Sequence, residues 1–311
     1  MVFISQPYES VTVDKFWPEN IAKHSRLVYL PYFTAQSVRG DARKQSLFQM
    51  PVLLYSWRII TQSEEMLKWY GRISGKMVTD KVRVTGLPKW DYSVGLKDVQ
   101  VPQAWKEKLN GKSVFLWNTH YNLGNTSTDI LNFAEKVIDY METQPSLALI
   151  WRPHPLTETI VKVYFNGQYY GKWLELLERV NKSSNIIYDN TESYDTAFSC
   201  SDALISDLSS LVTQYLLTQK PILLHINQEI QTAKTDLADP ENNVVDLSVL
   251  PIANDLQGYK EFMHEISQGK DTMRNSRMEL LKRDFSNADG KIGERICEML
   301  MEELIDEEAG K

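Results

Sequence analysis

The sequence has 311 residues, of which 42% are hydrophobic and 24% are charged. This composition is typical of a globular protein, and the length allows two domains. A net charge of −7 gives no overall attraction to nucleic acid, so no nucleic-acid partner is expected. The chain has no run of about 18 apolar residues and no basic leader, which predicts neither a membrane-spanning helix nor a signal peptide. Its two cysteines lack metal-ligand spacing, and neither a metal site nor a cofactor is expected.

Short apolar runs in the first third of the chain predict a small, mostly parallel sheet. The expected strands are 2–5, 27–30, 51–55 and 81–84. A helix is expected at 61–70, with Thr61 or Ser63 as its N-cap. About 90 residues is few for a doubly wound domain, so either the domain is reduced or the sequence starts inside a longer one. Residues 92–112 contain little core and place the domain boundary near residue 100.

Strands and helices alternate after the boundary, which predicts βαβ units around a parallel sheet. The expected strands are 114–117, 147–151, 185–188, 203–206 and 221–224. The expected helices are 103–109, 127–142, 172–181, 194–200, 211–220, 259–268, 272–283 and 289–308. Polar residues 226–254 are expected to form a long loop with one short strand. We therefore predict an α/β fold of two Rossmann-like domains with parallel sheets, a reduced one at 1–100 and a second at 101–311.

The most informative stretch is 200–225, whose pattern is that of a strand, a polar turn, a helix and a strand. Asp207, Ser209 and Ser210 directly follow the first of these strands, and such residues cap helix N-termini. A helix N-terminus at the carboxyl end of a central strand is a ligand site in open α/β sheets and favours phosphate. The alternative is an ordinary capped helix.

Two further strand ends carry candidate site residues. Arg152 and His154 alternate with prolines after the strand 147–151, so they project from a fixed turn. The Arg donors match phosphate oxygens, and His can bind phosphate or carry a proton near neutral pH. Asn118 and Thr119 end the strand before, where hydrogen bonding within the loop is the alternative. We prefer a functional role for Arg152 and His154 over surface or core packing.

Two loops offer weaker candidates. Residues 85–91 end a strand and are interpreted as an interdomain loop, with Lys89 and Asp91 as candidate cleft residues. Near the C-terminus, Asp289 or Asn287 is expected to cap the last helix. Lys291 and Arg295 follow in its first turns, against the usual charge preference there, which indicates a nearby anion or acidic partner.

The order of these motifs resembles the CDP-glycerol glycerophosphotransferase family of teichoic acid synthesis. The motifs are Gly86-Leu87-Pro88-Lys89-x-Asp91, Asn118-Thr119, Arg152-Pro153-His154-Pro155, Ser206-Asp207-x-Ser209-Ser210 and Asp289-Gly290-Lys291. The resemblance covers about residues 82–299. It implies a GT-B-like fold, in which the first domain takes the acceptor and the second binds the nucleotide donor. The His-Gly-Thr-Pro stretch typical of the family's first domain is absent from this sequence.

The resemblance also implies a function. The chain would transfer glycerol phosphate or a related alditol phosphate from a CDP-linked donor to a hydroxyl acceptor, releasing CMP. A lipid-linked or polymer acceptor implies a cytoplasmic protein with peripheral contact to the inner face of the cell membrane. The site residues would be His154 and Asp207 as catalytic groups, and Arg152, Thr119, Ser209, Ser210, Asp289 and Lys291 in donor binding. The alternatives are a nucleotide-sugar glycosyltransferase on the same scaffold and a non-catalytic donor-binding protein.

Overall fold

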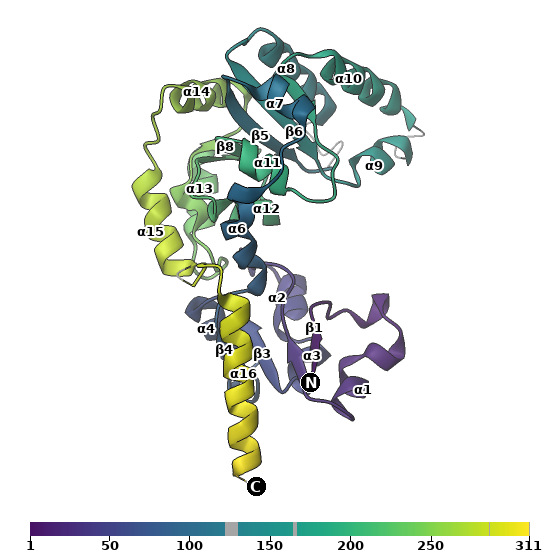
Figure 1. Ribbon diagram of the computed structural model, residues 1–311, viewed down its shortest axis with the longest axis vertical. Helices are drawn as coiled ribbons and strands as arrows, with labels where there is room; N and C mark the ends of the chain where they lie inside the picture. The colour runs from purple at the N-terminus through teal and green to yellow at the C-terminus, as the bar shows by residue number, and fades with distance from the viewer. Residues whose placement is uncertain (122–129, 164–166, 286, 311) are drawn as a thin grey trace. The chain divides into compact units, whose positions relative to one another are not determined.

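The computed structural model describes residues 1–121, 130–163, 167–285 and 287–310. It divides into two compact units (Figure 1). Unit 1 comprises Met1–Gly95, Leu237–Leu247 and Glu279–Lys311, and unit 2 comprises Leu96–Asp236 and Ser248–Met278. The expected boundary near residue 100 thus does not separate the two units completely, because the later segments Leu237–Leu247 and Glu279–Lys311 also belong to unit 1.

Unit 1 contains a four-stranded sheet in which every neighbouring pair is parallel. The strands, in spatial order, are β1 (Val2–Ile4), β2 (Leu27–Tyr29), β3 (Arg58–Thr61) and β4 (Val82–Val84). The strands expected at 2–5, 27–30 and 81–84 are thus confirmed. β2 is apolar and fully buried, as expected for a strand inside a parallel sheet, whereas the edge strands β1 and β4 are only partly buried and β4 contains Arg83.

The strand expected at 51–55 is wrong, because Pro51–Tyr55 forms the helix α3. Pro51 occupies the first helical position, where its fixed φ suits a helix and its missing N–H costs nothing. Periodicity cannot distinguish a helix from a strand in so short an apolar run. The third strand is instead β3, which begins at Arg58.

Short helices surround this sheet. They are α1 (Pro18–Ala22), α2 (Asp41–Phe48), α4 (Glu64–Ile73), α5 (Lys76–Thr79) and α6 (Tyr92–Gly95). The helix expected at 61–70 is α4, and Ser63 is its N-cap, since the Ser63 hydroxyl accepts a hydrogen bond from the Met66 N–H at 3.3 Å.

The C-terminal helix α16 (Ile292–Ala309) packs on the sheet of unit 1 and runs beside β3 and β4 in Figure 1. Arg58 of β3 and Arg83 of β4 both form ion pairs with Glu303 of this helix. Arg58 also reaches Glu307 one turn later, at 3.1 Å. These pairs explain why α16 belongs to unit 1, although the sequence analysis grouped it with residues 101–311.

Unit 2 contains a six-stranded parallel sheet in the order β10-β9-β8-β5-β6-β7. Its strands are β5 (Ser113–Thr119), β6 (Leu147–Pro153), β7 (Ile186–Tyr188), β8 (Ala203–Ser206), β9 (Ile222–His225) and β10 (Ile252–Ala253). All five strands expected after the boundary are confirmed, and β10 is the short strand expected within 226–254. The strand order reverses between β5 and β8, and such switch points are where open α/β sheets bind ligands.

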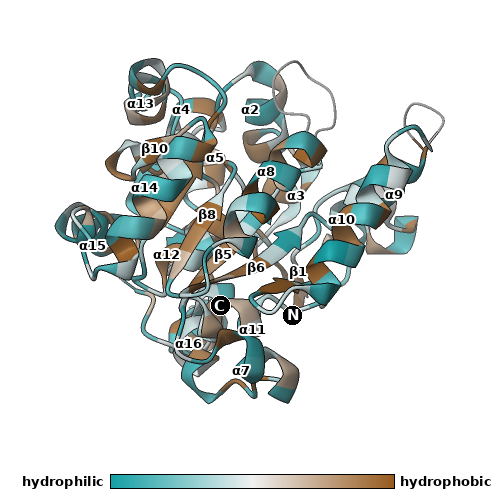
Figure 2. Ribbon diagram, turned by 90° about the horizontal axis from the view of Figure 1, so that it is seen from above, coloured by the Kyte–Doolittle hydropathy of each residue, from teal (hydrophilic) through white to brown (hydrophobic). Residues whose placement is uncertain are grey.

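Helices cover this sheet, and its core lies on the side of α8, α10 and α14. The helices of unit 2 are α7 (Gln103–Leu109), α8 (Ile130–Glu142), α9 (Thr157–Val163), α10 (Tyr170–Lys182), α11 (Asp195–Cys200), α12 (Ser210–Leu216) and α14 (Leu256–Ser267). Two further helices, α13 (Ile230–Ala238) and α15 (Arg274–Asp284), begin in unit 2 and end in unit 1. Phe115 and Trp117 of β5 and Trp151 of β6 are buried in one cluster with α8, α10 and α14. Figure 2 shows hydrophobic strands and largely hydrophilic α10 and α14.

Two expected features differ at their boundaries. The helix expected at 127–142 is described from Ile130, and its first three expected residues lie outside the described residues. The loop expected at 226–254 contains the helix α13. Glu229 explains this helix, because its carboxylate accepts the N–H groups of Gln231 (3.0 Å) and Thr232 (2.7 Å) at the helix start.

Candidate functional site at the switch point of unit 2

Asn118 connects the elements that meet at the switch point. Its side-chain amide donates hydrogen bonds to the hydroxyls of Ser206 (3.0 Å) and Ser209 (3.2 Å). Ser206 ends β8, and Ser209 occupies the N-cap position of α12 without a side-chain capping bond. The hydroxyl expected to cap the helix is therefore used to hold the end of β5, and Ser210 begins the helix with an exposed side chain.

Asp207 bonds to the end of β5. One carboxylate oxygen accepts the backbone N–H of His120 at 2.6 Å. Burial raises the pKa of Asp207, while the His120 N–H and the rings of His225 and His120 act to lower it. The burial of Asp207 makes hydrogen-bond donors such as hydroxyl groups favourable partners of its carboxylate.

His154 lies beside a second histidine. Its ring centroid is 5.7 Å from that of His120 and 4.7 Å from that of Tyr121, and His120 stacks on Tyr121 at 4.1 Å. The backbone N–H of His154 donates to the Thr119 carbonyl at 2.8 Å, which ties the two strand ends together. Burial, with a smaller contribution from His120, lowers the pKa of His154, so its ring is neutral at pH 7.

The tautomer of His154 follows from its own loop. The Leu156 N–H donates to Nδ1 of His154 at 3.1 Å, so Nδ1 is the acceptor nitrogen. The neutral ring then carries its proton on Nε2. His154 therefore presents an N–H donor at the site, not a free lone pair.

Arg152 is engaged inside the protein. Nη1 lies 2.6 Å from a carboxylate oxygen of Asp189 and donates to the Thr191 hydroxyl at 3.2 Å, and Nη2 donates to the Thr191 carbonyl at 2.8 Å. Arg152 is 8% exposed and Asp189 is 1% exposed. Thr119 is also buried, and its hydroxyl accepts the Trp151 indole N–H at 3.3 Å. Donor binding by Arg152 and Thr119 stays a prediction.

Asp289 and Lys291 lie in unit 1, whereas His154 lies in unit 2. The expected capping of the last helix by Asp289 or Asn287 is wrong, because Asp91 accepts the first N–H groups of α16. Asp289 instead accepts the Lys291 N–H at 3.1 Å and pairs with Arg295 at 2.7 Å. The acidic partner expected near Arg295 is thus Asp289, in the loop that precedes α16.

A cavity of about 370 Å³ at the same sheet edge contains a residue that the sequence analysis missed. His225, the last residue of β9, lines it together with His120 and Asp207. Both ring nitrogens of His225 and Nδ1 of His120 are buried without a hydrogen-bond partner in the described part of the chain. The only sequence signal for His225 is its place at a strand's carboxyl end.

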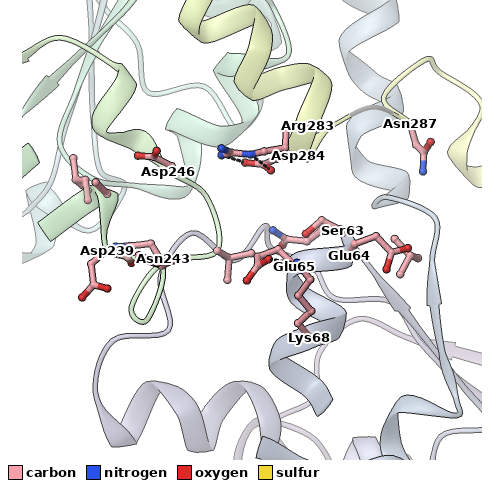
Figure 3. A pocket seen from close by; sticks show the side chains of 16 residues that line it. Ser63, Glu64, Glu65, Lys68, Asp239, Asn243, Asp246, Arg283, Asp284 and Asn287 are labelled. Carbon is pink, nitrogen blue, oxygen red and sulfur yellow. Dashed lines mark hydrogen bonds and ion pairs between the residues drawn. The ribbon is translucent and has the colours of Figure 1, made fainter. Parts of the chain in front are cut away.

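A larger cavity, of about 500 Å³, lies in unit 1 (Figure 3). Its acidic lining includes Glu64 and Glu65 of α4 and Asp239 and Asp246 of the segment 237–247. Arg283 also faces this cavity, but it pairs with the neighbouring Asp284. The acidic side chains outnumber Lys68 and Arg283, and this excess of negative charge disfavours a phosphate ligand in the cavity.

No helix in the described ranges is long and apolar enough to cross a membrane. Within the same ranges, no three His, Cys, Asp or Glu side chains are grouped so that they could hold a metal ion.

Comparisons with known proteins agree with the expected fold. Residues 76–302 match the sequence model of the family described as CDP-glycerol:poly(glycerophosphate) glycerophosphotransferase. The wall teichoic acid polymerase TagF is similar in structure, with 16% identity, a TM-score of 0.59, and coverage of 92% of this chain and 69% of that one. No curated protein matches the sequence significantly.

Two other solved structures have the same fold. A TagF variant soaked with CDPG has 14% identity and a TM-score of 0.58, and covers 92% of this chain and 68% of its own. A co-structure of S. aureus MnaA with UDP has 13% identity and a TM-score of 0.59, and the match covers 92% of this chain and 72% of the MnaA chain. The α/β, GT-B-like fold class is thereby confirmed.

Proposed function

This chain belongs to the CDP-glycerol:poly(glycerophosphate) glycerophosphotransferase family, and we propose that it transfers glycerol phosphate or a related alditol phosphate from a CDP-linked donor to a hydroxyl acceptor. The observation that carries the proposal is the family match over residues 76–302. It is supported by the gathering of Thr119, His154, Asp207 and Ser209 around the switch point of unit 2. Synthesis of teichoic acid or another cell-surface polymer is the process we assign to it.

The reaction is a phosphoryl transfer. The acceptor hydroxyl oxygen forms a bond to the phosphorus that carries the alditol, and the bond from this phosphorus to the bridging oxygen of CMP breaks. The acceptor hydroxyl loses its proton, and CMP leaves with the electron pair of the broken bond. Such transfers depend on positioning and on stabilising the charge of the phosphoryl oxygens and leaving group.

His154 acts in this proposal as a donor. Its Nδ1 accepts the Leu156 N–H, so its Nε2–H is the atom available to a phosphate oxygen or to the leaving CMP. A neutral ring with this tautomer cannot take the proton of the acceptor hydroxyl. The base for that step is therefore a different group, and the proposal assigns none.

The remaining residues have supporting roles in this proposal, and they include Asp207, which the sequence predicted as a catalytic group. Ser209 and Ser210 at the start of α12 receive a donor phosphate, and Asp207 accepts hydrogen bonds from hydroxyl groups of the donor. Arg152, Thr119, Asp289 and Lys291 remain proposed donor-binding residues on the resemblance alone. A lipid-linked or polymer acceptor, and peripheral contact of the chain with the inner face of the cell membrane, belong to the same proposal.

CMP release tests the function directly. The intact protein is incubated with CDP-glycerol and a glycerol phosphate or lipid-linked acceptor, and CMP is measured over time. We expect His154→Ala to slow release by at least about 100-fold, while the exposed His24→Ala stays at the wild-type rate. Absence of CMP release from the wild type would reject the function. A wild-type rate from His154→Ala would reject only the role of His154.

A further inference from the structure

The cavity beside Asp207 contains hydrogen-bonding atoms that the protein itself does not use. His225 is 8% exposed, and neither Nδ1 nor Nε2 has a partner in the described part of the chain. The rings of Phe133 and Tyr259 flank it, with centroids 5.0 Å and 5.5 Å from that of His225. Buried polar atoms in folded proteins nearly always have partners, so these two nitrogens indicate a ligand.

The charge of the lining determines which ligand fits. Burial lowers the pKa of His225, against the opposing effect of Asp207 and Asp255, so the ring is neutral at pH 7 and offers one donor and one acceptor. Asp207 adds a carboxylate, and no Lys or Arg is found among the described residues that line the cavity. A phosphate in this cavity would be repelled by the Asp207 carboxylate, with no Lys or Arg in the described lining to offset the charge. A neutral group with several hydroxyls can instead donate hydrogen bonds to Asp207 and both donate to and accept from His225.

The walls and size of the cavity agree with such a group. Trp117, Phe133 and Leu208 provide apolar surface for carbon–hydrogen faces. A volume of about 370 Å³ corresponds to roughly a dozen water molecules at about 30 Å³ each. An open-chain polyol of three to five carbons fits within it.

We propose that this cavity binds the alditol chain of the CDP-linked donor, with His225 and Asp207 hydrogen-bonding its hydroxyls. The inference rests on the proposed function and adds His225 and the apolar walls to the donor site. Asp207 accepts hydroxyl protons, and the His225 ring donates to one hydroxyl oxygen and accepts from another. The phosphates remain outside the cavity, toward Ser209 and His154.

The test separates binding of the alditol from binding of the nucleotide. Dissociation constants of CMP, CDP, CDP-glycerol and CDP-ribitol are measured by calorimetry on the full chain. His225→Phe keeps an aromatic ring against Phe133 and Tyr259 but removes both nitrogens. We expect it to weaken CDP-alditol binding about tenfold, as for the loss of one or two hydrogen bonds, and to leave CMP and CDP binding within about twofold. The exposed His264→Gln is the matched control.

A second variant makes the test independent of the folding of His225→Phe. Leu208 lines the cavity but is 46% exposed, so Leu208→Trp narrows the cavity from its surface. We expect the same selective loss of CDP-alditol binding. If the variants weaken the binding of CDP and of CDP-glycerol equally, the cavity holds the nucleotide. If they change the binding of neither ligand, the alditol does not bind in the cavity. If the wild type binds none of the four ligands, the proposed function fails as well.

Discussion

Asp91 bonds to the backbone N–H of Gly293, 202 residues later in the chain, at 2.8 Å. Its second carboxylate oxygen accepts the Ile292 N–H at 3.0 Å. These N–H groups belong to the first turn of α16, which has no capping side chain of its own. Asp91 therefore supplies the missing cap and also places negative charge at the positive end of the helix dipole.

Removal of this cap should destabilise unit 1. We expect Asp91→Ala to lower the free energy of unfolding by about 1–2 kcal/mol, because two N–H groups lose their acceptor. The measurement is urea denaturation followed by circular dichroism. Substitution of the exposed Asp98, in Asp98→Ala, should change the free energy of unfolding by less than about 0.5 kcal/mol. Equal stability of the two variants would contradict the capping role.

Gly86 should tolerate substitution less well than a glycine in open space. It has φ +81°, and an added Cβ would lie 3.1 Å from Ile292 Cδ1 and 3.2 Å from the Trp90 ring. Gly111 also has a positive φ, of +70°, but nothing lies within 4 Å of an added Cβ. We expect Gly111→Ala to cost about 1 kcal/mol and Gly86→Ala at least about 2 kcal/mol. Thermal unfolding of both variants gives the comparison, and similar melting temperatures would contradict the crowding.

The Arg152–Asp189 ion pair should contribute more to folding than an exposed pair. Its side chains are 10% and 0% exposed, whereas Arg179 and Asp139 are 33% and 59% exposed. Loss of one partner leaves a buried charge without compensation, so Asp189→Asn should cost about 3 kcal/mol. Asp139→Asn should cost less than about 1 kcal/mol. A cost of less than about 1 kcal/mol for Asp189→Asn in urea denaturation would contradict this contribution of the buried pair.

Most strands could be predicted because buried parallel strands are continuous apolar runs bounded by polar residues. The same rule failed at Pro51–Tyr55, where five apolar residues form a helix. It also missed α13, because the N-terminal N–H groups of that helix are bound by Glu229, which is not a typical capping residue.

The candidate site could be predicted in part for a geometric reason. The carboxyl ends of parallel strands meet at one edge, so Thr119, His154 and Asp207 were expected close together, and hydrogen bonds connect these strand ends. The pairing of Arg152 with Asp189 could not be predicted, because it requires the relative positions of β6 and the loop after β7. His225 could not be distinguished from a core histidine, because its missing partners are visible only in three dimensions.

The stability of the protein should depend on pH through His225 and Asp207, with opposite signs. Burial lowers the folded-state pKa of His225 below its usual 6.5, so below about pH 6.5 the unfolded chain binds a proton that the folded chain does not. This contribution makes the fold less stable as pH falls. Burial raises the folded-state pKa of Asp207 above its usual 3.8, so the folded chain takes that proton first, and the fold gains stability as pH falls toward 4.

Two substitutions separate these contributions. Urea denaturation at pH 7, 5.5 and 4.5 gives the free energy of unfolding for the wild type, His225→Phe and Asp207→Asn. Between pH 7 and 5.5 we expect the free energy of unfolding to fall less for His225→Phe than for the wild type. The difference between the two slopes is at most about 1.4 kcal/mol per pH unit, the value for one proton. Asp207→Asn should lack the gain at the lower pH values. If His225→Phe parallels the wild type throughout, burial does not lower the pKa of His225, and its ring is protonated in the folded chain as readily as a free histidine.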